Sequence, residues 1–211
     1  MTKTQAQIPT QPKIYTFNQF IEWLPENPSA RYELHNGNII EMSQPTGEHE
    51  EIKGFLARKV SVEFDRLNLP YFIPNQAIVK PPEKESGYFP DVLLLNRPNL
   101  SHEKRWKTEA TVSQGASIPL VIEVVSTNWR DDYHFKFADF EQMGIPECWI
   151  ADYAALGGKK FIADPKQPTI SVCQLVGDEY QVTNFVDHDL IISPIFPNLK
   201  LTAQQVFDSV L

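Results

Sequence analysis

Two carboxylates interrupt short aliphatic segments of this chain. Asp91 precedes Val-Leu-Leu-Leu, and Glu123 stands inside the segment Leu-Val-Ile-Glu-Val-Val at residues 120–125. An ionised carboxylate among branched aliphatic side chains is costly to desolvate unless a cation, hydrogen-bond donors or water reaches it. Carboxylate oxygens are also ligands that Mg²⁺ prefers in proteins. The two acids therefore predict a shared metal site.

Each acid also has a purely structural interpretation. Asp91 would accept backbone hydrogen bonds at the start of a strand. For Glu123 a structural role is the weaker alternative, because its neighbours are aliphatic and glutamate is seldom buried without a partner.

The composition is that of an enzyme-sized globular protein. The chain has 211 residues, of which 42% are hydrophobic and 22% charged, so it can bury a sizeable core. We expect a flexible lead-in over residues 1–13 and one domain over residues 14–211. The formal net charge of -8 is unlike the basic footprint of a protein that coats nucleic acid, although a local basic surface or a bridging metal would permit such a substrate.

The cysteines and the hydropathy pattern bear on the compartment. Cys148 and Cys173 lack the spacing of a zinc ribbon or a disulfide framework, so we interpret Cys148 as a reduced core thiol. No apolar run of the sequence approaches the roughly 18 residues of a membrane span, and the first residues lack the apolar segment of a secretory signal. We expect no membrane partner and a cytoplasmic location.

Local patterns predict the elements that precede the acids. Thr16 opens a capping box ahead of a short helix that ends near Pro25. Residues 31–34 and 39–42 flank an Asn-Gly pair and predict a β-hairpin. From Glu48 to Asn68 an apolar stripe with an acidic start predicts the long core helix.

The acids themselves lie on two predicted strands. A strand at 119–125 leads into a helix over 130–143 and a strand over 148–151, which together make a strand-helix-strand unit. The remaining expected strands cover residues 71–79, 91–95, 159–163, 169–175 and 180–185, and a short helix covers 202–210. The pattern predicts an α/β fold in which a central mixed sheet bears the acids, helices flank the sheet, and hairpins extend it at both ends.

The order of these features resembles the PD-(D/E)xK nuclease superfamily. Asp91 follows a proline, Glu123 lies on a later strand, and a helix comes directly after that strand. In this superfamily two acids hold a divalent metal, and a lysine two residues after the second acid positions or activates water. Val125 occupies that position here, so the usual lysine is missing.

The flanking segments are similar to one branch of that superfamily, the Uma2-type (DUF820) restriction-endonuclease-like proteins. The similar segments are Tyr-Glu-Leu-His-Asn-Gly at 32–37, residues 123–150, and Pro-Ile-Phe-Pro-Asn-Leu at 194–199. The resemblance covers nearly the whole chain after the lead-in. It implies a restriction-endonuclease-like core and an endonuclease that hydrolyses DNA phosphodiester bonds with Mg²⁺ or Mn²⁺ as cofactor.

The resemblance also implies roles for individual residues. Asp91 and Glu123 would hold the metal, with the backbone carbonyl of Val124 as a further ligand. Lys136, on the helix after the Glu123 strand, would replace the missing lysine, because its long stem can lie along an apolar face. The alternative for Lys136 is an i,i+4 ion pair with Asp132, worth a few tenths of a kcal/mol.

Two further sets of residues are weaker candidates. Glu33 and His49 are expected to position metal or water, or else to be a solvated carboxylate and a local hydrogen-bonding histidine. The densest basic stretch would contact phosphate and stack on an unpaired base, or else form a solvated charged loop. Its residues are Lys104, Arg105, Trp106 and Lys107.

Two rival functions stay open at this stage. A catalytically inactive module that binds nucleic acid or protein would keep the fold, with Val125 marking the lost lysine; the position of the Lys136 ammonium separates this module from a nuclease. A phosphodiesterase acting on RNA or small nucleotides would suit the acidic surface and would have a closed pocket. A homodimer is compatible with cutting two strands, although no motif specifies one.

Overall fold

The computed structural model describes residues 13–27 and 30–210, and its centre is a mixed sheet of six strands. The strand order is β10-β9-β8-β7-β5-β3, in which β7 and β8 run parallel and the other neighbours antiparallel. The strands are β3 (Tyr71–Phe72), β5 (Val92–Asn96), β7 (Leu120–Val124), β8 (Glu147–Asp152), β9 (Thr169–Val176) and β10 (Glu179–Phe185). The lead-in expected over residues 1–13 lies outside the described residues, apart from Lys13.

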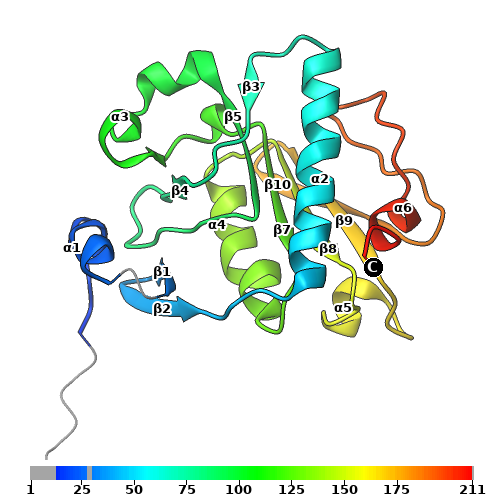
Figure 1. The fold of residues 1–211 in the computed structure, drawn as a ribbon, viewed down its shortest axis with the longest axis horizontal. Coiled ribbons are helices and arrows are strands. Elements are labelled where there is room, and N and C mark those ends of the chain that lie inside the picture. Colours follow the sequence, from blue (N-terminus) through cyan, green and yellow to red (C-terminus); the bar gives the residue numbers. More distant parts are fainter. Residues whose placement is uncertain (1–12, 28–29, 211) are drawn as a thin grey trace, which may run out of the picture.

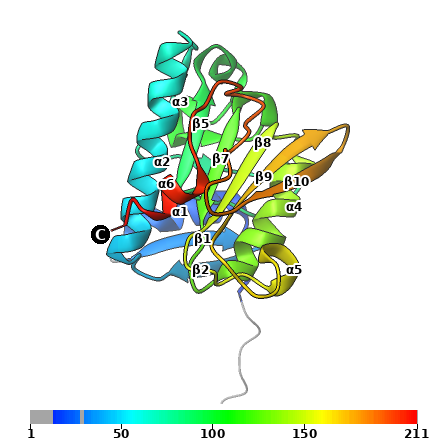
Figure 2. The same ribbon diagram turned by 90° about the vertical axis from the view of Figure 1, so that its right-hand side faces the viewer.

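Helices cover both faces of this sheet (Figures 1 and 2). On one face α2 (Gly47–Arg66) contributes Ile52 and other apolar side chains to a core shared with β5, β7, β8 and β9. On the opposite face lie a π-helix, η4 (Asp131–Lys136), and its continuation α4 (Phe137–Gln142), from which Phe140 is fully buried. These two elements connect the parallel strands β7 and β8, because a parallel pair needs a crossover connection. The predicted strand-helix-strand unit is confirmed.

Strand periodicity decides which way Glu123 faces. Ile122 and Val124 belong to the core on the α2 side, whereas Val121 and Val125 belong to the core on the α4 side. Successive side chains of a strand point to opposite faces of the sheet. Glu123 therefore faces η4 and α4.

A hairpin and several short elements surround one end of the sheet (Figure 1). The hairpin joins β1 (Arg31–His35) to β2 (Asn38–Met42) through Asn36 and Gly37, whose φ angles of 48° and 81° suit a type I′ turn. A bridge from Leu34 to Gly87 attaches it to the segment before β5. The other elements are α1 (Phe17–Trp23), η1 (Leu24–Glu26), β4 (Ile78–Val79), η2 (Arg97–His102), α3 (Trp106–Glu109), β6 (Thr111–Val112), η3 (Gly115–Ser117), α5 (Lys159–Ile162) and α6 (Ala203–Phe207).

Several local predictions are confirmed. Thr16 and Gln19 form the predicted capping box of α1, and a second capping box starts α6 at Thr202. Cys148 is a buried free thiol. Among residues 13–27 and 30–210, no helix combines the length and the apolar character that a membrane span requires.

Three predicted elements were wrong in part. The strand expected at 71–79 is divided into β3 and β4, which belong to different sheets, because Pro74 between them has no N–H for a ladder. The strand expected at 159–163 is the single-turn helix α5, which buries Ile162 and stacks Phe161 on Tyr133. The helix expected at 130–143 begins as a π-helix. Stretches of π-helix are rare and frequently mark functional sites.

Gly115 sits against the C-terminal end of α4. A Cβ atom at this position would lie 2.3 Å from the Met143 carbonyl oxygen and 2.6 Å from Gly144 backbone atoms, so Gly115→Ala must push two backbone segments apart. We expect it to lower the free energy of unfolding by about 1–3 kcal/mol, measured by urea denaturation. Gly54→Ala on α2 is the control, because a Cβ there meets nothing within 4 Å; it should stabilise the helix by roughly 0.5–1 kcal/mol. Unchanged stability of Gly115→Ala would contradict this packing.

Candidate active site

The antiparallel pairing of β5 and β7 brings the two predicted acids to one edge of the sheet. Val92 at the start of β5 pairs with Ile122 near the end of β7. Asp91, just before β5, accepts a hydrogen bond of 2.9 Å on Oδ2 from the backbone N–H of Val124. Glu123 and Asp91 both line a pocket of about 240 Å³, as do the side chains of Lys136, Glu33 and His49.

Lys136 is buried at the centre of this pocket. Its Nζ lies 3.3 Å from Oε2 of Glu123, 3.3 Å from Oε1 of Glu33 and 3.6 Å from Oδ1 of Asp132. The i,i+4 pair with Asp132 therefore exists, but it is one of three contacts of the same ammonium group. The π-helix places Lys136 where it joins carboxylates from a strand, a hairpin and its own helix.

Glu33 is held inside the site by the hairpin. Its side chain is 2% exposed, so the solvated alternative is wrong. Oε1 accepts a hydrogen bond of 2.9 Å from the Phe89 N–H, and Oε2 lies 2.9 Å from Nε2 of His35. The pKa of Glu33 is raised by burial but lowered more strongly by Lys136 and His35, so its net direction is downward. Glu33 is therefore a charged partner of the lysine.

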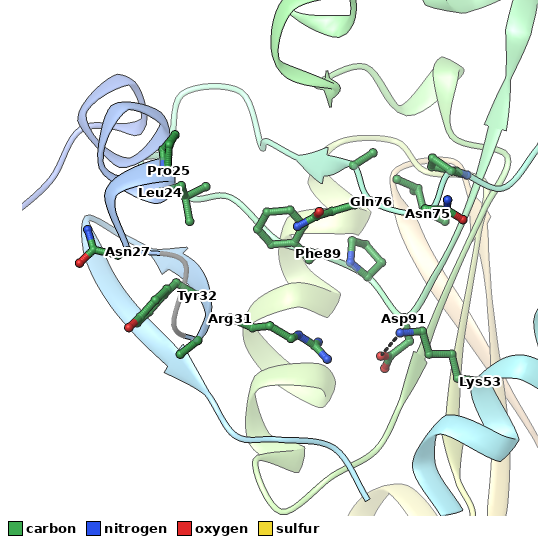
Figure 3. A pocket seen from close by; sticks show the side chains of 15 residues that line it. Leu24, Pro25, Asn27, Arg31, Tyr32, Lys53, Asn75, Gln76, Phe89 and Asp91 are labelled. Atoms are coloured by element: carbon green, nitrogen blue, oxygen red, sulfur yellow. Dashed lines mark ion pairs between the residues drawn. The ribbon is translucent and has the colours of Figure 1, made fainter. Parts of the chain in front are cut away.

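His49 connects the start of α2 to Asp91. Nε2 lies 3.0 Å from the Val124 carbonyl oxygen and 3.4 Å from Oδ2 of Asp91. Lys53, one turn later on α2, places Nζ 4.0 Å from Oδ1 of Asp91 (Figure 3). Burial alone would lower the pKa of His49, but the hydrogen bond and charge of Asp91 raise it overall. The structure thus gives Asp91 cationic partners on both oxygens.

The two central acids differ in their electrostatics. Burial raises the pKa of Asp91, but His49 and the Val124 amide outweigh burial, so Asp91 ionises below its ordinary range. Burial raises the pKa of Glu123 well above its ordinary value, and Lys136 offsets this effect incompletely because Asp132, Asp91 and Glu33 oppose it. Burial likewise raises the pKa of Asp132 to about 7.

Carboxylates outnumber cations around Lys136. Burial would lower the pKa of Lys136, yet Glu123, Glu33 and Asp132 raise it well above the ordinary value. The lysine is consequently protonated and cannot act as a base at neutral pH. One ammonium group cannot neutralise three carboxylates, which explains why the pKa values of Glu123 and Lys136 both rise.

Glu147 shows how a structural buried acid differs from Glu123. Its oxygens accept hydrogen bonds from the Trp149 indole, the Ser193 hydroxyl and the Ile195 backbone N–H. Oε1 of Glu123, in contrast, is buried and has no hydrogen-bond partner among the described residues. A buried polar atom without a partner is costly and calls for an explanation such as a missing ion or water.

The residues present fit a hydrated divalent cation better than an enclosed one. Among residues 13–27 and 30–210, no group of three or more His, Cys, Asp and Glu side chains converges to hold a metal. Mg²⁺ keeps several waters and is usually bound by one or two carboxylates together with substrate phosphates. Asp91 and the free oxygen of Glu123 match that requirement. The carbonyl of Val124 already contacts His49, so its second lone pair would have to serve the metal.

The basic stretch is placed away from these acids. It follows the C-terminal end of β5, whereas Asp91 precedes the N-terminal end of the same strand. Arg105 bonds to Glu109 and Asn18, and Trp106 packs edge-on against Phe72. Lys104 and Lys107 are exposed. The structure does not bring these four residues to the pocket.

Sequence reasoning missed three residues of the site. Asp132 entered only as an ion-pair partner, and Lys53 and His35 were not singled out. Helical spacing could have found Lys53, which lies four residues after His49. Strand alternation could have found His35, which shares a face of β1 with Glu33.

Removing the Lys136 ammonium should destabilise the fold in a pH-dependent way. Lys136→Met leaves Glu33, Glu123 and Asp132 buried together, and we expect a loss of about 3–5 kcal/mol at pH 8 in EDTA. Without the lysine the folded-state pKa values of these acids rise further above their unfolded values, so stability is lost as the pH rises and the deficit shrinks toward pH 5. Urea denaturation across this range checks the sign. Lys159→Met, at an exposed pair with Asp164, should change little.

Neutralising Glu123 should have the opposite effect. Because its folded-state pKa is raised, the wild-type chain loses stability as the pH passes through that pKa. Glu123→Gln removes this loss, so in EDTA it should unfold at higher urea than wild type at pH 8 and at similar urea at pH 5. A destabilised Glu123→Gln at pH 8 would contradict the charge surplus described above.

Comparisons with known proteins agree with this architecture. A crystal structure of "a putative nuclease belonging to DUF820" from Anabaena variabilis ATCC 29413 has a TM-score of 0.68 and 16% sequence identity, and the match covers 93% of this chain and 99% of the other. At this identity the likeness shows the fold, and it confirms the central mixed sheet flanked by helices. No curated protein matches the chain. A family model described as "Uma2: Putative restriction endonuclease" matches residues 17–204, and the chain therefore belongs to the Uma2 family.

Proposed function

We propose that this protein is a metal-dependent endonuclease that hydrolyses DNA phosphodiester bonds at the pocket of Asp91, Glu123 and Lys136. Membership of a family described as restriction endonucleases supports nuclease chemistry in general. The observation that carries the specific proposal is the position of Lys136, whose Nζ lies 3.3 Å from Glu123 although the sequence has Val125 where the superfamily has its lysine. An ammonium group is thus present beside the second acid by a different route.

Each side chain has a defined part in this proposal. Asp91 and Glu123 would hold Mg²⁺ or Mn²⁺, which when bound polarises a phosphoryl oxygen and lowers the pKa of an attacking water. Lys136 keeps its proton and stabilises the negative charge that develops on the phosphate. Glu33 and Asp132 hold the Lys136 ammonium in position, and His49 fixes the orientation of Asp91.

The rival functions fit these contacts less well. An inactive binding module has no need for a protonated lysine among three buried carboxylates, which is an arrangement that costs stability. A phosphodiesterase for small nucleotides would need a pocket closed on all sides, whereas the Asp91 pocket adjoins a second one. Cutting both strands of a duplex would use two copies of the site, and we propose a homodimer for that case.

Cleavage assays on purified protein test the proposal. We expect plasmid or single-stranded DNA to be cut with Mg²⁺ or Mn²⁺ and not with EDTA, as read on gels. Asp91→Asn and Glu123→Gln should each lower the cleavage rate by at least about 100-fold, and Lys136→Met by a similar factor, because each removes a group that acts on the transition state.

The control replaces a lysine of another buried ion pair. Lys84 contacts Asp139 outside the pocket, so Lys84→Met should leave the cleavage rate of the folded protein close to that of wild type. Cleavage that survives Asp91→Asn and Glu123→Gln, or that proceeds in EDTA, would overturn the mechanism. Loss with the two acids but not with Lys136→Met would remove the lysine assignment alone.

A further inference from the structure

A second, larger pocket continues from the active site. Its volume is about 770 Å³, within the ~300–1,000 Å³ range of pockets that take small ligands. Asp91 and Phe89 line both this pocket and the one that contains Lys136. The walls come from β1, from the segment between β3 and β4, and from α2 (Figure 3). A group bound here would lie directly beside the carboxylate that holds the metal in the proposed function.

The lining combines a cation, an aromatic ring and amide groups. The Arg31 guanidinium points toward Asp91 (Figure 3), is exposed, and has no ion-pair partner among the described residues. The Phe89 ring lies between the hairpin and Gln76, half-buried, with one side toward the pocket (Figure 3). Asn75 and Gln76 carry exposed amides, which donate and accept hydrogen bonds as base edges do.

These groups match the parts of one nucleotide. Arginine contacts phosphate oxygens, and an aromatic ring stacks on a base whatever its sequence. A base can reach such a ring only after it leaves the stack of a duplex, which costs a few kcal/mol and costs least for a strand that is already single. The net charge of -8 adds to this argument, because it disfavours wrapping a long duplex.

We propose that this pocket binds an unstacked nucleotide next to the scissile phosphate, so that the preferred substrate is single-stranded or locally opened DNA. The inference rests on the proposed nuclease function and names its substrate class. Arg31 holds the flanking phosphate, and Phe89 is the stacking platform for the base. Both are positioning residues, because neither touches the reacting atoms.

Binding in the absence of turnover tests the pocket. Full-length Glu123→Gln protein in EDTA is titrated into a fluorescent single-stranded oligonucleotide, its blunt duplex and an RNA strand of the same sequence, and the anisotropy is measured. The single DNA strand should bind at least about tenfold more tightly than the duplex, because the duplex must first be unstacked. Added Phe89→Ala or Arg31→Ala should each weaken that binding about tenfold, whereas Phe89→Trp should keep it.

Lys200→Ala is the matched control for charge, because Lys200 is exposed and lines neither pocket. Arg31 is also exposed, so Arg31→Ala remains informative if Phe89→Ala fails to fold. Equal binding of strand and duplex, equal binding after Phe89→Ala and Arg31→Ala, or tighter binding of RNA would overturn the inference. Single-strand binding that depends on both residues, in a wild-type protein that cuts nothing with Mg²⁺ or Mn²⁺, would support the pocket and overturn the nuclease function.

Discussion

The contact of one lysine ammonium with three carboxylates is the constraint on which this part of the molecule depends. Lys136 joins Glu33 from the hairpin, Glu123 from the sheet and Asp132 from its own helix. Without that charge each carboxylate would have to be neutral or solvated, because an unpaired buried charge is strongly disfavoured. The lysine therefore fixes the hairpin, the sheet and the crossover helix relative to one another.

The same cluster carries more negative than positive charge. Evolution does not select such a surplus for stability, since well-packed apolar side chains usually serve that purpose as well or better. Asp91 avoids the problem by contacting His49, whereas Glu123 keeps one oxygen without a partner. Strain of this kind at a site indicates a ligand that removes it, and a divalent cation has the required charge.

The sequence was informative wherever a local rule decides the outcome. The capping box at Thr16, the turn at Asn36 and Gly37, and the order of Asp91 and Glu123 all depend on near neighbours, and each is found as predicted. The role of Glu33 could not be decided, because its burial results from a contact with a helix one hundred residues later in the chain. The helix α5 was missed because tertiary packing on Tyr133 outweighs local propensity there.

The π-helix η4 has a consequence for how this family can change length. Each residue of a helix turns the chain by about 100°, so one deletion between Glu123 and Lys136 would swing the ammonium group away from all three carboxylates. An insertion at the tip of the β1–β2 hairpin, in contrast, would leave Arg31, Glu33 and their pairing with β2 in place. Insertions and deletions among natural homologues should accordingly gather at the hairpin and be rare in the short crossover before Lys136.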